Sequence, residues 1–254
     1  MIKFFRHIRK SLLSENKFSK YLIYAIGEIA LVMIGILLAL QVNNWNENRK
    51  AEEKELKLLI ELKDDLIETK KDLMTDIERI PQLLNITNAL YKSINEGKIS
   101  ETDPFKLPQG YLLVYPILYP KLSAYEAIQS EGISIISNDK LRKEITDFYQ
   151  LHLNRVAWAE EKLEELNNKV LKPYLIANSA YGSGCKDCAD LYELLRTNKG
   201  TRGQFYILSH VDDELVHMLK DNFNWLNVIN RRYLALSETI DDMIVLIDQE
   251  TNFK

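Results

Sequence analysis

The sequence predicts an all-α protein with one N-terminal transmembrane helix that continues into a stalk helix, followed by a helical-bundle extracytoplasmic domain. Three observations lead to this fold class. The stretch 21–42 is apolar except for a single charge. Glycine and proline number only 9 and 6 in 254 residues, which favours long helices over a strand-rich fold. Apolar residues recur at helical spacing through much of the remaining chain.

Charge divides the chain into three parts. Residues 1–20 hold six basic side chains and one acidic side chain, which gives +5, and residues 21–42 hold −1. Since the whole chain carries −4, the remainder carries −8, which argues against nucleic-acid binding there. The basic head, residues 1–20, fits an amphipathic helix lying on an anionic membrane face. An equal alternative is that its cations only set the topology.

The apolar stretch 21–42 predicts a transmembrane helix. At ~1.5 Å per residue it reaches about 33 Å, enough for a hydrocarbon core of roughly 30 Å. A cleavable signal peptide is the alternative, but its apolar core is normally about 7–15 residues, and no A-x-A cleavage pattern follows here. The basic head orients the N-terminus to the cytoplasm, which predicts a single-pass bacterial inner-membrane protein with residues 43–254 in the periplasm. Interfacial aromatic anchors are expected at Tyr21, Tyr24 and Trp45.

One carboxylate interrupts the span. Glu28 lies roughly 10 Å deep at helical rise, where an ionised group is costly unless it has a partner or water. Gly35 and Ala39 form a small-xxx-small pattern that permits close approach of a second helix. These three residues predict an intramembrane assembly contact with a second copy or another membrane protein. The alternative is a carboxylate near the interface that local water tolerates.

The region after the span reads as a series of helices. Residues 43–80 predict the stalk helix, because apolar pairs repeat seven residues apart, and the lysines of a second row weaken a strict coiled coil. Pro81 is expected to bend the helix or to start a new one that stops near residue 95. Further helices are expected from Ser123, with the spacing of a capping box, and from about residue 138 until Pro173. The last helix is predicted over 205–248.

Residues 98–120 form the least regular part of the chain. Four of the six prolines fall here, together with Tyr111, Tyr115 and Tyr119. This composition predicts a loop ordered by its aromatic side chains. Tyrosines suit binding surfaces, so these three are the candidate binding loop, although packing under a loop explains them equally well.

The span and its flanks carry a family resemblance. The stretch "SENKFSKYLIYAIGEIALVMIGILLALQVNNWNENRK" resembles the N-terminal signature of an uncharacterised family of single-span membrane proteins of Bacteroidota, and the likeness continues through "LSAYEAIQSEG" and "LRKEITDFYQLH". The most specific part combines Gly27-Glu28 inside the span with Asn44-Trp45-Asn46 after it. The resemblance implies a topology and a fold but no activity. It also makes Glu28 a feature of the family.

The candidate chemistry is sparse. The two cysteines, Cys185 and Cys188, predict a small disulfide outside the cytoplasm, with a redox dithiol or two inert thiols as alternatives. Glu214 and His217 have the spacing used by di-iron bundles, but the second copy that such a site needs is missing, so no metal is expected. No nucleophile elbow and no phosphate loop is present.

These observations predict a protein without enzymatic activity or cofactor. The leading function is an interaction or assembly subunit that associates, through its span and stalk, with its own copy or with another membrane protein. The alternative is a membrane-tethered helical bundle that senses a small-molecule ligand of unknown identity.

Overall fold

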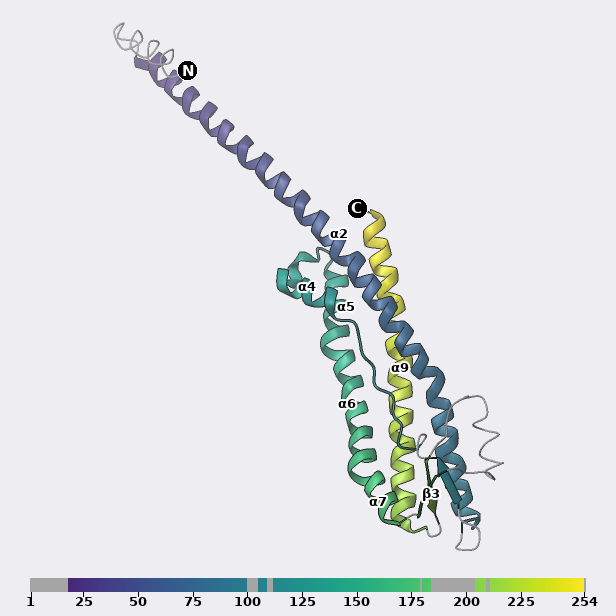
Figure 1. The fold of residues 1–254 in the computed structure, drawn as a ribbon. Helices are drawn as coiled ribbons and strands as arrows, with labels where there is room; N and C mark the ends of the chain where they lie inside the picture. The colour runs from purple at the N-terminus through teal and green to yellow at the C-terminus, as the bar shows by residue number, and fades with distance from the viewer. Residues whose placement is uncertain are drawn as a thin grey trace. The chain divides into compact units, whose positions relative to one another are not determined.

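A computed structural model describes residues 18–99, 105–108, 112–178, 180–183, 204–208 and 211–253, and the basic head predicted over residues 1–20 falls largely outside them. The chain divides into two compact units, Met1–Leu56 and Lys57–Lys254. The first helix, α2 (Phe18–Asn95), begins in the first unit and ends in the second. The predicted all-α architecture, with one long apolar N-terminal helix, is confirmed, since helices make up most of the described chain (Figure 1).

In the first unit, α2 is long and apolar enough to cross a membrane. An 18-residue window has a mean hydropathy of 2.3, and none of that window is buried in the structure. The large apolar side chains described between Leu22 and Val42 are more than half exposed, so no described part of the chain shields them from water. Burial in hydrocarbon would satisfy such a surface.

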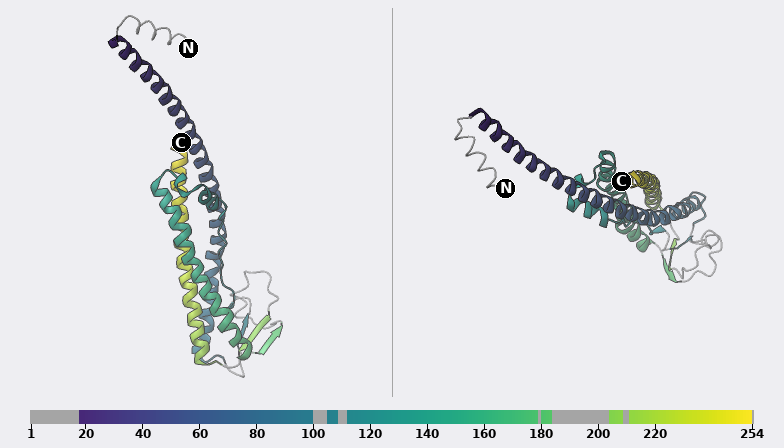
Figure 2. Two further views of the ribbon diagram at one scale, coloured as in Figure 1. Left: turned by 90° about the vertical axis from the view of Figure 1, so that its left-hand side faces the viewer. Right: turned by 90° about the horizontal axis from the view of Figure 1, so that it is seen from above.

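The second unit is a bundle in which the C-terminal part of α2 packs against α6 (Leu153–Glu165) and α9 (Asp213–Phe253) (Figures 1 and 2). Two ion pairs show that α2 and α9 run antiparallel: Lys63 bonds to Asp248 and Lys70 to Asp241, each at 2.5 Å. A step of seven residues toward the C-terminus of α2 corresponds to a step of seven residues toward the N-terminus of α9. The lysines that weaken a coiled-coil pattern in the sequence therefore pair with carboxylates of the same chain.

The apolar pairs of α2 are split between the core and the surface. The first members, Leu59, Leu66 and Leu73, are fully buried, as helical packing on one face requires. The second members, Ile60, Ile67 and Met74, are 49%, 43% and 37% exposed. They follow each other at intervals of seven residues, so they lie on one side of α2. We call these three residues the outer row.

Helix α2 does not restart at Pro81. It runs past the proline to Asn95, so the expectation of a new helix there is wrong. Pro81 is exposed, and buried apolar residues continue on the opposite face at Ile80 and Leu83, which offsets the hydrogen bond lost at the ring. The helix ends in a Schellman motif: Gly97 has φ of 65°, and the Lys98 N–H donates to the Ser93 carbonyl at 3.0 Å.

The short helix α4 (Ser123–Glu131) begins where the sequence predicts, but its cap comes from elsewhere. Ser123 is the first helical residue, not the N-cap, and the Leu122 position before it provides no side-chain cap. Instead, Asp65 Oδ2 on α2 accepts hydrogen bonds from Ser123 Oγ and from the Ala124 N–H, each at 2.8 Å. An anionic acceptor at a helix N-terminus satisfies free backbone donors and complements the helix dipole.

Replacing Asp65 with alanine is expected to lower the free energy of unfolding by about 1 kcal/mol, because the α4 N-terminus loses its acceptor. Urea unfolding of the full-length protein in detergent, followed by circular dichroism, measures this change. Asp64→Ala is the matched control, since its exposed carboxylate is one residue away and turned to solvent. Equal stability of the two variants would contradict the capping role of Asp65.

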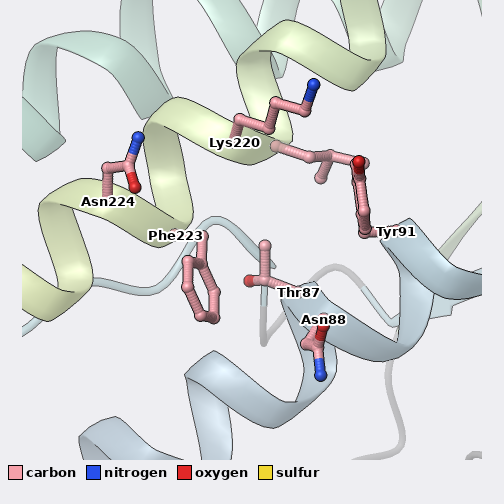
Figure 3. A pocket seen from close by; sticks show the side chains of 7 residues that line it. Thr87, Asn88, Tyr91, Lys220, Phe223 and Asn224 are labelled. Atoms are coloured by element: carbon pink, nitrogen blue, oxygen red, sulfur yellow. The ribbon is translucent and has the colours of Figure 1, made fainter.

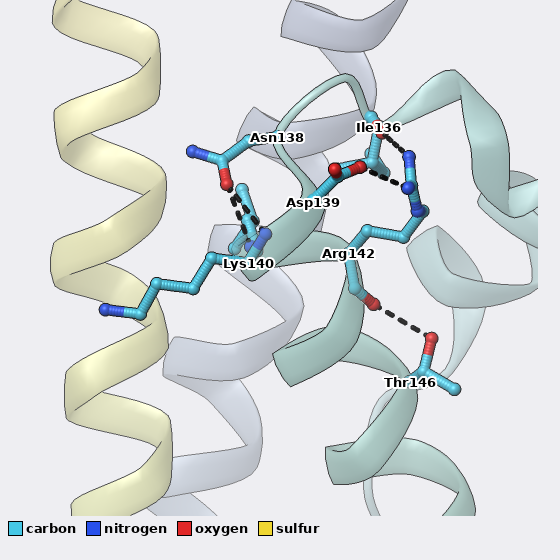
Figure 4. A network of polar contacts seen from close by, with 7 residues as sticks. Ile136, Asn138, Asp139, Lys140, Arg142 and Thr146 are labelled. Atoms are coloured by element: carbon cyan, nitrogen blue, oxygen red, sulfur yellow. Dashed lines mark hydrogen bonds and ion pairs between the residues drawn. The ribbon is translucent and has the colours of Figure 1, made fainter.

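The next helical stretch is nearly continuous over forty residues but changes its pitch twice. It comprises α5 (Asp139–Asp147), the π-helical segment η2 (Phe148–His152), α6, a second π-helical segment η3 (Leu166–Leu171) and α7 (Lys172–Asn178). The start predicted near residue 138 is confirmed, because Asn138 Oδ1 accepts from the N–H groups of Lys140 and Leu141 at 3.0 and 3.1 Å (Figure 4). Arg142 braces this turn by donating to the Ile136 carbonyl at 3.0 Å.

The sequence pattern predicted that Pro173 ends this helical stretch, and that prediction is wrong. It is the second residue of α7, which continues to Asn178. We attribute this tolerance to η3, since the wider π turn relaxes the clash between a proline ring and the preceding turn.

A small antiparallel sheet completes the unit and was not expected from the sequence. Its strands are β1 (Phe105–Pro108), β2 (Ala180–Ser183) and β3 (Gln204–Leu208), in the order β1-β3-β2. β1 lies within the predicted 98–120 loop. Phe105 pairs with Leu208, and Ala180 pairs with Ile207, so the strands come together from three distant parts of the chain.

The last helix therefore begins later than predicted. The range 205–248 is corrected to Asp213–Phe253, because residues 204–208 pair as a central strand. Asp212 Oδ1 accepts the Leu215 N–H at 2.9 Å, which is an N-cap contact, and the same oxygen accepts the Tyr174 hydroxyl at 2.8 Å. The cap thus ties the start of α9 to α7.

Candidate functional site

A carboxylate is buried where α6 and α9 meet the segment that precedes α4. Glu160 is 6% exposed, and its Oε1 accepts the Tyr233 hydroxyl and, at 3.2 Å, the Leu118 N–H. Burial raises the pKa of Glu160 above its usual 4.5, and these two hydrogen bonds oppose part of that rise. Burial and the neighbouring Glu160 also raise the pKa of Tyr233. Both groups are structural partners rather than exposed acids.

The same segment is held against α2 by side chains spaced along one face of that helix. Thr69 Oγ1 accepts the Lys121 N–H at 2.9 Å, and Asp72 accepts the Tyr119 N–H at 3.4 Å. With Asp65 at α4, these acceptors replace the backbone partners that an extended segment lacks.

The tyrosines of the predicted binding loop have separate environments. Tyr119 is 72% exposed, whereas Tyr115 is half-buried and accepts a hydrogen bond from the Asn168 amide at 3.2 Å. Tyr111 lies outside the described residues. Of the two described tyrosines only Tyr119 is exposed, and neither lines the two pockets described in the second unit.

The core of the second unit is divided by a polar layer. One apolar cluster reaches Leu83 on α2 and Leu226 on α9, and a second begins at Leu90 and Leu219. Between them lie three buried polar side chains, Thr87, Asn222 and Asn167. Thr87 Oγ1 lies 3.3 Å from Asn222 Oδ1, and the Asn222 amide donates to Asn167 Oδ1 at 2.9 Å. The Asn167 amide nitrogen has no partner among the described residues, although it is buried.

A groove between α2 and α9 opens at the level of this polar layer. Its volume is about 310 Å³. Buried Thr87 and Leu219 line it, and exposed side chains rim it (Figure 3). The lining residues are Thr87, Asn88 and Tyr91 from α2, and Leu219, Lys220, Phe223 and Asn224 from α9. The Lys220 ammonium lies 5.7 Å from the centre of the Tyr91 ring, within cation–π range.

The residues predicted for the span all lie on α2 in the first unit. Glu28 is half-buried, and Gly35 and Ala39 are exposed. Trp45 is exposed, while the side chains of Tyr21 and Tyr24 lie outside the described part. A Cβ built at Gly35 would meet no atom within 4 Å, so the fold of this chain does not itself require glycine there.

The remaining candidates are not brought into a site. Cys185 and Cys188 lie outside the described residues. Glu214 and His217 are exposed on α9, and the described residues contain no group of three or more His, Cys, Asp or Glu side chains placed to hold a metal ion.

Sequence reasoning missed the groove and the polar layer. Thr87 and Asn222 are 135 residues apart and sit in apolar helical patterns. One sequence signal points to them. In each helix, a single polar residue occupies a position that the spacing of the apolar residues before and after it assigns to the core.

The chain matches the model of a known family. The model of a family of unknown function (DUF6090) matches residues 28–174, which is more than half of the chain. No curated protein and no solved structure matches.

Proposed function

Since this chain belongs to DUF6090, a family of unknown function, we propose a role from its own structure: a membrane-anchored, non-enzymatic assembly subunit. It would be a single-pass protein of the bacterial inner membrane, with a cytoplasmic N-terminus and a periplasmic helical domain. It associates through α2 with a second copy of itself or with another membrane protein.

The outer row is the observation that carries this proposal. Its three side chains are large, apolar and 37–49% exposed, and they repeat every seven residues along one side of α2. The apolar core does not include these positions, because the neighbouring leucines already fill it. Of the three, Met74 contacts α9 through a hydrogen bond, which its Sδ accepts from Ser237 Oγ at 3.8 Å. A regularly spaced apolar stripe that the chain's own bundle leaves exposed is what a helix of a partner packs against.

The span supplies a second contact. Gly35 and Ala39 leave room for close approach of another helix, and no neighbour among the described residues occupies that room. In hydrocarbon, the Glu28 carboxyl gains most when it donates or accepts a hydrogen bond in a protein interface. Both contacts lie on the same helix, which would align copies along α2.

Replacing Glu28 with leucine is expected to lower the mass of the full-length protein in mild detergent from an oligomer to a monomer, because the intramembrane hydrogen bond is lost. Size-exclusion chromatography with light scattering measures that mass and reveals co-eluting proteins. Glu28→Gln is the matched control, since an amide keeps the hydrogen-bonding capacity without the charge, and should retain the oligomer.

A wild-type protein that is monomeric and elutes without any other protein would overturn the proposal. If the oligomer persists in Glu28→Leu, the intramembrane contact is excluded, and the outer row remains as the proposed interface.

A further inference from the structure

The groove between α2 and α9 coincides with three irregular features of the second unit. The apolar core is interrupted at this level by Thr87, Asn222 and Asn167. Asn167 belongs to the π-helical segment η3. Its buried amide nitrogen has no partner among the described residues. A buried polar group without a partner lowers stability, and π-helical segments are frequent at functional sites. Because the polar layer and η3 both lie at the level of the groove, we look for a function there.

The lining of the groove defines the chemistry of a ligand. Lys220 is the only charged residue among the seven that line it, and all seven belong to the described chain. Asn88, Asn224 and Thr87 add neutral hydrogen-bonding groups, while Phe223 and Leu219 add apolar surface. An ammonium without a carboxylate in the same lining favours an anion, and the apolar surface favours a ligand with an apolar body.

We propose that this groove binds a small organic carboxylate with a flat apolar body. Its carboxylate pairs with Lys220, and its body lies against Phe223 and Leu219. A volume of about 310 Å³ is at the lower end of the range for small-molecule sites, which suits a single-ring acid. Thr87 connects this site to the polar layer, since it lines the groove and its hydroxyl donates to Asn222 Oδ1. The inference is independent of the assembly role, and it gives the ligand-sensing alternative a site.

The test uses 4-fluorophenylacetate, observed by fluorine NMR, with the full-length protein in detergent. Saturable binding is expected below about 10 mM, because a ligand of this size binds weakly. The uncharged 4-fluorophenylacetamide should bind about tenfold more weakly, or not at all, since it has the same ring but no charge.

Variants locate the site. Lys220→Gln should weaken binding of the acid by about tenfold and leave binding of the amide unchanged. Phe223→Ala should weaken binding of both probes, because it removes apolar contact. Lys143→Gln, an exposed lysine on α5, is the control and should bind like the wild type. Lys220 is exposed, so its replacement should leave the circular dichroism spectrum unaltered.

Three results would overturn the inference. They are the absence of saturable binding by the acid, equal binding of the acid and the amide to the wild-type protein, and unchanged binding of the acid to Lys220→Gln.

Discussion

Replacing Glu160 with alanine is expected to lower the free energy of unfolding by about 2–5 kcal/mol, because two buried donors lose their acceptor. The Tyr233 hydroxyl and the Leu118 N–H both donate to Glu160 Oε1, and Tyr233 is fully buried. Truncation to alanine leaves both donors without this protein acceptor. Denaturant unfolding of the full-length protein in detergent, at constant pH, measures this loss.

Glu160→Gln separates hydrogen bonding from charge. The amide oxygen can accept both hydrogen bonds, so this variant should lose far less stability than the alanine variant. A similar loss in both variants would mean that the charge of Glu160, rather than its role as an acceptor, stabilises the site.

The pH dependence of the same pair follows from the raised pKa of Glu160. A carboxyl that holds its proton more tightly in the folded state contributes stability below the unfolded pKa of about 4.5, and this contribution is lost as pH rises through the raised folded pKa. Glutamine has no proton to lose. The stability of Glu160→Gln relative to the wild type should therefore increase from about pH 4.5 upward and then level off. A difference that is constant across this range would contradict the raised pKa.

Leu66→Ala is expected to reduce mainly the stability of the fold, and Ile67→Ala mainly self-association, although the two residues are adjacent. Leu66 is fully buried in the core, and its truncation should cost about 2–5 kcal/mol of unfolding free energy through lost burial and a residual cavity. Ile67 is 43% exposed in the outer row, so its truncation should cost less than about 1 kcal/mol.

Assembly should respond in the reverse order. If the outer row is an interface, Ile67→Ala removes apolar contact in every copy and should weaken self-association by about tenfold. Sedimentation velocity over a range of protein concentrations measures the association, and unfolding curves of the same samples measure stability. An Ile67→Ala protein that associates like the wild type would exclude the outer row as the contact, whatever its stability.

Much of the helical architecture could be predicted from local pattern. The apolar stretch 21–42, the heptad pairs of α2 and the Asn138 cap each depend on residues close together in the sequence. The errors lie where distant residues intervene. α2 continues through Pro81 because the apolar face on both sides of it is buried, and the last helix starts at Asp213 because residues 204–208 pair with strands from elsewhere.

The candidate site was less predictable than the fold. The lysines of α2 read as defects in a coiled coil until Asp241 and Asp248, more than 170 residues away, provide their partners. The groove needs side chains from two antiparallel helices, and neither helix alone contains a recognisable binding motif.

The sequence by itself determined one helix long enough to span a membrane, a helical domain after it, and the two adjacent apolar rows of α2, because hydropathy and helical periodicity are local properties. Only the tertiary structure decided which row enters the core, which carboxylate caps α4, and where the polar layer meets a groove. Those outcomes depend on contacts between residues far apart in the chain, and no local pattern fixes which distant groups will meet.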